Sequence, residues 1–150
     1  MANLRIVAIC SGGGHWVQMQ RLLPAFAEHS VTLIGVDPAY RTEAGGRPFH
    51  WVNDANRWNK FGLVLMALRL LWILIRLRPH IAISTGAAPG YVGLRIARWF
   101  GARTIWVDSI ANVEQLSMSG RMIGPHADLW LTQWPDLARP GGPTYEGAVF

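Results

Sequence analysis

Short apolar segments alternate along this chain with longer segments that have helical periodicity. The apolar segments are rich in β-branched residues and lack the polar–apolar alternation of a strand with one wet face, so they predict strands covered on both sides. Alternation of such strands with helices predicts an α/β fold with a doubly wound parallel sheet. We expect strands at residues 5–10, 31–36, 49–52, 80–84, 104–107 and 129–132, and helices at 16–28, 59–76 and 89–100 and within 112–123.

The length and composition fit a single domain that spans residues 1–150. Hydrophobic residues make up 51% of the chain and charged residues only 15%, which indicates large buried or partnered surfaces. The net charge is +5, but the arginines are dispersed, and several lie within apolar segments. This distribution favours anionic lipids or phosphate-bearing substrates as ligands and argues against nucleic acid as a partner. Cys10 is the single cysteine, so we expect no disulfide and a reducing compartment.

The first apolar segment runs directly into Ser11-Gly12-Gly13-Gly14-His15, and a helical segment follows. Three glycines between a strand and a helix allow a tight turn and let a ligand approach the main chain closely. The N-terminus of the helix adds N–H groups and a positive dipole, so the loop predicts a site for phosphate or diphosphate that His15 faces. A glycine-rich turn with a structural histidine explains the loop equally well.

This loop does not match the familiar nucleotide-binding motifs. No Lys-Ser or Lys-Thr pair follows the glycines, as a Walker A loop requires. Val17 stands where a dinucleotide-binding fingerprint has its third glycine or alanine, and Asp37, which Pro38 follows, is better explained as a turn residue than as a ribose ligand. The sequence has no spacing typical of metal ligands, and we expect neither a metal nor a cofactor.

Small and polar residues follow several of the expected strands. Ligands of open parallel sheets collect at the carboxyl ends of the strands, so we expect one cleft at that edge. Asp108 ends the fifth expected strand, where it could act as a base, bind a sugar hydroxyl or cap the next helix. The residues that we expect to bind substrate in this cleft are Ser11, Gly12, Gly13, Gly14, Thr85, Gly86 and Ser109.

Residues 61–77 form an apolar segment that is almost long enough to span a bilayer. Two arginines within it argue against spanning, because an arginine near the bilayer centre costs about 2.5–3.5 kcal/mol even on a lenient scale. We expect a helix that packs on the sheet and dips its outer face into lipid; burial by a partner chain or within the core would give the same pattern. The residues expected at the membrane are Phe61, Leu65, Leu68, Arg69, Trp72 and Arg76.

The last segment of the chain, residues 135–150, is rich in proline and glycine yet ends in apolar residues. A solvated tail would not normally carry Tyr145, Val149 and Phe150, so we expect it to dock, either on its own domain or on another chain. Residues 133–150 are the stretch that we expect to contact a partner.

Several blocks of this sequence resemble the successive motifs of one family of glycosyltransferase subunits. The blocks are the glycine loop at 11–15, Ser84-Thr85-Gly86-Ala87-Ala88-Pro89-Gly90, Trp106-Val107-Asp108-Ser109-Ile110-Ala111, and the segments 116–121 and 127–135. Together they resemble the acceptor-side subunit of split glycosyltransferases, of the PssD type and the Alg-fourteen-like type. The same family resembles the N-terminal half of MurG-like enzymes, which implies a Rossmann-like domain equivalent to the N-terminal domain of a GT-B glycosyltransferase.

This resemblance implies an acceptor- and membrane-binding subunit of a two-chain inverting glycosyltransferase. A second chain would supply the UDP-sugar-binding domain, and the acceptor would be a polyprenyl-diphosphate-linked saccharide at the cytoplasmic face of the plasma membrane. His15 would then be the catalytic base or a phosphate ligand, and Asp108 a catalytic acidic residue near the acceptor. A base is needed in such a reaction to take the proton of the acceptor hydroxyl. The alternative is a non-catalytic membrane anchor that recruits a catalytic partner chain.

Overall fold

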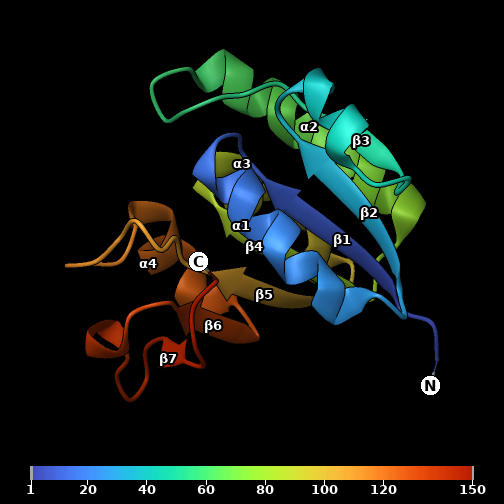
Figure 1. Ribbon diagram of the computed structural model, residues 1–150. Helices are drawn as coiled ribbons and strands as arrows, with labels where there is room; N and C mark the ends of the chain where they lie inside the picture. The colour runs from blue at the N-terminus through green and yellow to red at the C-terminus, as the bar shows by residue number, and fades with distance from the viewer. Residues whose placement is uncertain (1, 150) are drawn as a thin grey trace.

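A computed structural model describes residues 2–149, which form a seven-stranded sheet in which every neighbouring pair of strands is parallel (Figure 1). The order across the sheet is β3-β2-β1-β4-β5-β6-β7. The direction of winding reverses between β1 and β4, so the prediction of a doubly wound parallel sheet is confirmed. The strands are β1 Arg5–Cys10, β2 Ser30–Gly35, β3 Phe49–Trp51, β4 Ile81–Gly86, β5 Arg103–Val107, β6 Leu129–Thr132 and β7 Thr144–Tyr145.

Helices cover both faces of the sheet, as the uniformly apolar strands require. The α-helices are α1 Gly14–Leu22, α2 Lys60–Leu77, α3 Ala87–Trp99 and α4 Met118–Ile123. Helix α1 packs on one face, whereas α2, α3 and α4 contribute buried side chains to the cluster on the other. Short 3₁₀ helices lie in the connections at Leu23–Phe26, Pro38–Glu43, Gly124–His126 and Pro135–Leu137.

Successive residues of β1 point into the two halves of the core. Val7 and Ile9 pack in the cluster that contains Met66, Leu70 and Leu94, while Ile6, Ala8 and Cys10 pack in the cluster that contains Trp16 and Met19 of α1. This is the period of two that a strand imposes on its side chains. Burial raises the pKa of the Cys10 thiol to about 12, although a hydrogen bond with Thr85 lowers this pKa slightly. The sulfur therefore stays protonated at neutral pH.

The structure corrects several of the expected boundaries. The first helix was expected to reach residue 28, but α1 ends at Leu22 and a 3₁₀ turn follows, because Pro24 has no N–H and its ring crowds the preceding turn. Strand β4 continues to Gly86, and α3 begins at Ala87, which places Pro89 in the first turn, where no N–H is needed. Strand β7 has two residues, too few for a periodic pattern to reveal.

Asp128, which directly precedes β6, forms hydrogen bonds with residues of β5 and α3. Its carboxylate accepts hydrogen bonds from the Thr104 N–H (2.8 Å) and from Arg98 (3.0 Å), with which it also forms an ion pair. Burial acts to raise the pKa of Asp128, but the backbone hydrogen bond and the arginine charge outweigh it and lower the pKa.

The described part of the tail docks on its own domain. The Val149 N–H donates to Oε1 of the buried Gln133 at 2.9 Å, and Arg21 on α1 donates to the Val149 carbonyl at 3.3 Å. The expectation of docking is therefore confirmed for residues up to 149, and the alternative of docking on its own domain is the one observed. Phe150 lies outside the described residues.

Candidate functional site

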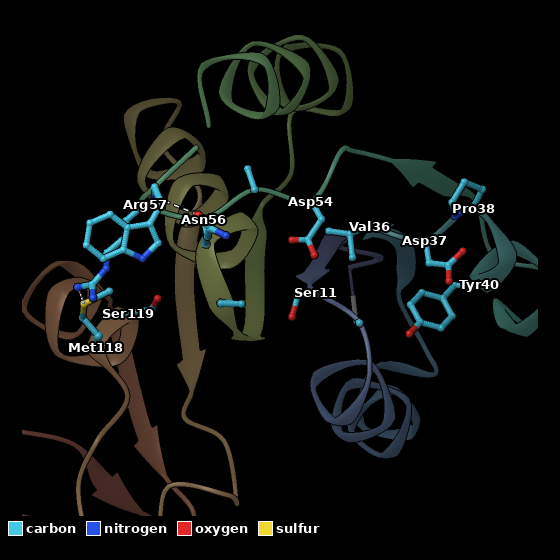
Figure 2. Close-up of a pocket in the computed structure, with 15 residues that line it drawn as sticks. Ser11, Val36, Asp37, Pro38, Tyr40, Asp54, Asn56, Arg57, Met118 and Ser119 are labelled. Atoms are coloured by element: carbon cyan, nitrogen blue, oxygen red, sulfur yellow. Dashed lines mark hydrogen bonds between the residues drawn. The ribbon is translucent and has the colours of Figure 1, made fainter. Parts of the chain in front are cut away.

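A cleft of about 1010 Å³ lies at the carboxyl ends of β1, β2, β3 and β4. It therefore contains the point between β1 and β4 where the sheet reverses direction, the usual ligand position in such folds. Figure 2 shows Asp37 and Tyr40 on one side, Arg57 and Met118 on the other, and Ser11 and Asp54 between them. The remaining lining residues are Gly12, Val36, Pro38, Ala55, Asn56, Trp58, Ala87, Ala88 and Ser119.

The glycine loop lies at this cleft and is open to solvent. Ser11 and Gly12 line the cleft, and Gly13 and Gly14 are exposed at the start of α1. Gly13 has a φ of 62°, in the left-handed region, and a Cβ there would meet open space. This conformation, which glycine adopts without strain, turns the chain from β1 into α1 within three residues.

His15 is half-buried beside the cleft, which it does not line, and is held by hydrogen bonds to the end of β4. Its Nδ1 lies 2.9 Å from the carbonyl oxygen of Thr85, and the Thr85 hydroxyl donates in return to the His15 carbonyl at 2.7 Å. Because a carbonyl oxygen can only accept, Nδ1 must carry the proton in this contact. In the neutral ring, Nε2 is then the nitrogen with a free lone pair, as a general base requires.

Gly86 allows this arrangement because it has no side chain. Its φ is 147°, and a Cβ at this position would overlap the imidazole, with His15 Nδ1 at 2.3 Å and Cε1 at 2.4 Å. The expected substrate-binding residues Thr85 and Gly86 contact His15, but both are buried and neither lines the cleft. The lining residue Ala87 follows them directly in the chain.

Two helices begin at the cleft without a side-chain cap. The N-cap residues of α1 and α3 are Gly13 and Gly86, which have no side chain that could cap the helix. Their own N–H groups donate to the hydroxyls of Tyr40 and Ser84. The first N–H groups of an α-helix have no partner within the helix, and they carry partial positive charge. Since Gly12, Ala87 and Ala88 line the cleft beside these two starts, the arrangement suits an anion with several oxygens, such as a diphosphate.

Tyr40 braces the glycine loop from the 3₁₀ helix after β2. Its hydroxyl accepts a hydrogen bond from the Gly13 N–H at 2.9 Å, and its ring stacks on Trp16 at 4.3 Å between centroids. One N–H of the loop is therefore already occupied by protein. Asp37 accepts from the Ala39 N–H at 2.9 Å, which confirms its interpretation as a turn residue.

Asp108 lies below the cleft and does not line it. Only 1% of its surface is exposed, and its two carboxylate oxygens accept four hydrogen bonds. Oδ1 accepts from Trp106 Nε1 (3.0 Å) and from the Ser117 hydroxyl (2.5 Å), and Oδ2 accepts from the Ser117 N–H (2.9 Å) and from Asn112 Nδ2 (3.3 Å). This carboxylate organises the loop between β5 and α4, whose N-cap is Ser117. It has no oxygen left over for a substrate proton.

Ser109 is also buried, and its contacts are with protein. Its hydroxyl accepts from Gln18 Nε2 and from the Ala111 N–H, each at 3.2 Å. Gln18 Oε1 in turn accepts from Gln133 Nε2 at 2.6 Å, which links α1 to the loops after β5 and β6. Of the expected catalytic and substrate-binding residues, only Ser11 and Gly12 line the cleft. Asp108 and Ser109 do not, because these buried polar groups satisfy one another inside the protein.

Helix α2 presents an apolar face to solvent. Phe61 is 82% exposed, and Leu68, Trp72 and Arg76 are also exposed, whereas Leu65 and Arg69 are half-buried. The guanidinium of Arg69 lies 4.3 Å from the ring centre of Trp51, and that of Arg76 lies 4.2 Å from the ring of Trp72. Within residues 2–149, no helix has both the length and the apolar character that are needed to cross a bilayer.

Three cleft residues that the sequence analysis did not single out are Tyr40, Asp54 and Arg57. Tyr40 follows β2, and Asp54 and Arg57 follow β3. Their positions after β2 and β3 follow the general rule that ligands of open parallel sheets lie at the carboxyl ends of the strands.

Comparison with known proteins finds a family that matches this chain. A family model described as oligosaccharide biosynthesis protein Alg14 like matches residues 59–148. Among curated relatives named UDP-N-acetylglucosamine transferase subunit ALG14, that of Eremothecium gossypii is 37% identical over 67 residues, covering 41% of this chain and 30% of the relative. The corresponding protein of Aspergillus fumigatus is 54% identical over 39 residues, covering 26% of this chain and 17% of the relative. In both, the match spans less than a third of the relative's length.

Among solved structures, MurG of Acinetobacter baumannii superposes with a TM-score of 0.78 at 12% identity, over 97% of this chain and 46% of that one. UDP-N-acetylglucosamine 2-epimerase of Rickettsia bellii superposes with a TM-score of 0.70 at 14% identity, over 98% of this chain and 45% of that one. At these identities the likeness concerns the fold alone. It confirms the expected Rossmann-like domain of GT-B type.

Proposed function

Because the chain belongs to the family of Alg14-like oligosaccharide biosynthesis proteins, we propose that it is the acceptor- and membrane-binding subunit of a two-chain inverting glycosyltransferase. A second chain carries the UDP-sugar-binding domain, and UDP-N-acetylglucosamine is the first donor to consider, since it appears in the names of the curated relatives. The acceptor is a polyprenyl-diphosphate-linked saccharide at the cytoplasmic face of the membrane. The observation that carries this proposal is the cleft between two helix starts with glycine N-caps, with His15 beside it.

In this proposal the acceptor diphosphate lies at the starts of α1 and α3. Their N–H groups and helix dipoles offset its charge, as helix N-termini do for phosphates in general. The guanidinium of Arg57, on the opposite side of the cleft from Tyr40, adds a full positive charge (Figure 2). The saccharide then extends along the cleft toward the donor that the second chain holds.

His15 is the proposed base. As the acceptor oxygen bonds to the anomeric carbon of the donor sugar, the bond from that carbon to UDP breaks, and Nε2 of His15 takes the hydroxyl proton. The Thr85 carbonyl holds the other ring nitrogen protonated, which keeps the lone pair on Nε2 and fixes the ring plane. Asp108 is a positioning residue in this scheme, because it holds the loop after β5 in place through four hydrogen bonds.

Helix α2 is the proposed membrane contact. Its exposed side chains Phe61, Leu68 and Trp72 form an apolar face, and Arg76 lies beside Trp72, where a cation can reach anionic headgroups. A protein that binds the membrane through this face keeps its acceptor cleft close to the lipid surface.

The test is transfer by the chain co-expressed with its candidate partner, from a panel of UDP-sugars to a polyprenyl-diphosphate-linked acceptor. His15→Asn retains an N–H donor for the Thr85 carbonyl but has no basic nitrogen, so we expect transfer to fall by about 10²–10⁴-fold while the two chains still associate. His126→Ala, a change at an exposed histidine in the 3₁₀ helix Gly124–His126, is the control and should leave transfer unchanged. Undiminished turnover by the His15 variant would favour the alternative, a non-catalytic anchor that recruits a catalytic partner.

A further inference from the structure

A second hollow, of about 360 Å³, lies between α2, α3 and α4. Its walls are almost entirely apolar and include Val64 and Ala67 of α2, Tyr91 and Val92 of α3, and Met122 of α4. Its volume is within the range of small-molecule sites, about 300–1,000 Å³. We refer to it as the apolar groove.

The apolar groove adjoins the cleft described above. Four residues line both: Arg57, Ala88, Met118 and Ser119. Ala88 lies in the first turn of α3, beside the proposed diphosphate position, and Arg57 donates a hydrogen bond to the sulfur of Met118 at 3.4 Å. A polar, anion-binding cleft and an apolar groove thus share a wall, with a guanidinium at their junction.

The other end of the apolar groove reaches the exposed apolar face of α2. Val64 lines the groove and is 58% exposed, and it lies on the same side of the helix as Phe61 and Leu68. The groove therefore lies between the face that we propose to contact lipid and the cleft that we propose to hold diphosphate.

From this position beside the cleft we propose that the apolar groove binds the first isoprene units of the lipid-linked acceptor, next to its diphosphate. This inference rests on the proposed function and adds to it a site for the lipid. The chemistry required is an anion joined to a hydrocarbon chain, and the two hollows offer these environments in that order. A sugar or a nucleotide would leave its polar groups unpaired against the groove walls, which excludes them as occupants.

The test is calorimetric titration of the purified full chain with farnesyl diphosphate and, separately, with inorganic diphosphate. Burial of an isoprenoid tail strengthens binding, so we expect farnesyl diphosphate to bind at least about tenfold more tightly than inorganic diphosphate. Ala67→Trp fills the groove and should weaken farnesyl diphosphate by about tenfold or more while leaving inorganic diphosphate unchanged. Ile75→Trp, on the same helix but outside the groove, is the matched control and should alter neither affinity.

A second variant tests the groove independently, in case Ala67→Trp does not fold. Val64→Gln changes a largely exposed position of the groove wall, so it preserves the fold and should weaken farnesyl diphosphate alone. Equal affinities for the two ligands in the wild type, or unaltered farnesyl diphosphate binding in both groove variants, would overturn the inference even if the chain supports glycosyl transfer. Tail-dependent binding that Ala67→Trp abolishes, in a chain that supports no transfer with any partner, would support the groove and contradict the proposed function.

Discussion

Replacement of Asp108 by asparagine separates a role as catalytic base, which the sequence left open, from the structural role that its hydrogen bonds indicate. As a catalytic base, Asp108 could become an amide with little effect on stability and a large effect on transfer. As the organiser of the loop after β5, its replacement should lower stability strongly. The structure favours the second role, because the carboxylate is buried and accepts four hydrogen bonds.

The size of the effect follows from the donors around the two oxygens. An asparagine has one carbonyl oxygen, so its NH₂ group must face either Trp106 Nε1–H or the Ser117 N–H, and neither can accept a hydrogen bond. One buried donor then loses its partner, at about 1–3 kcal/mol, and the remaining bonds lose the assistance of the negative charge. We expect Asp108→Asn to lower the free energy of unfolding by about 3–4 kcal/mol. For a domain of this length the corresponding fall in Tm is about 6–16 °C.

Thermal and urea unfolding of the purified variant provide the assay, with Asp54→Asn as the matched control. Asp54 is exposed in the cleft, so the same chemical change there should alter the unfolding free energy by no more than about 0.5 kcal/mol. If Asp108→Asn unfolds at the wild-type temperature and has lost transfer, the reasoning is refuted and Asp108 is a catalytic group.

Three further predictions concern other parts of the fold. Cys10 should not react with thiol reagents in the folded protein at pH 8, because burial raises its pKa to about 12, and should react once the protein is unfolded in urea. Gly86→Ala should cost about 1–3 kcal/mol in backbone strain and displace the His15 ring, so both unfolding temperature and transfer should fall. Asp128→Asn should lower the unfolding free energy by about 1 kcal/mol at pH 7, a small value because solvent screens this half-exposed carboxylate. Folding lowers the pKa of Asp128, so the ionised carboxylate stabilises the folded state at pH values above the unfolded pKa of about 3.9. This stabilisation is lost as the pH falls through the lower pKa of the folded state. The unfolding free energies of the variant and the wild type should therefore converge in acid.

Each of these has a result that would contradict it. Rapid labelling of Cys10 under native conditions would show that β1 opens locally. Gly101→Ala is the control for Gly86→Ala, because Gly101 also has a positive φ (85°) but a Cβ there meets no atom within 4 Å. Equal losses in the two glycine variants would mean that backbone strain, and not the contact with His15, determines the effect. A loss of stability by Asp128→Asn that stays constant down to pH 2 would contradict the proposed pKa.

The sequence alone was sufficient for the order and type of the main elements. Short, uniformly apolar strands such as 5–10 and 80–84 require cover on both faces, and the helical segments between them supply it. The glycine loop before His15 was also interpretable, since a strand, three glycines and a helix start are consecutive in the chain. Rules of this kind act over a few residues, so they can be applied before the tertiary structure is known.

Only the tertiary structure decided which polar residues are available at the cleft. Asp108 and Thr85 both lie at the carboxyl ends of neighbouring strands, yet Asp108 turns inward to four donors while Thr85 holds His15 beside the cleft. The partners of a buried carboxylate come from its folded surroundings, here Trp106 and Ser117 among them, and no local pattern specifies how those side chains meet. The apolar groove beside the cleft is likewise a product of three packed helices, because its walls come from segments that are far apart in the sequence.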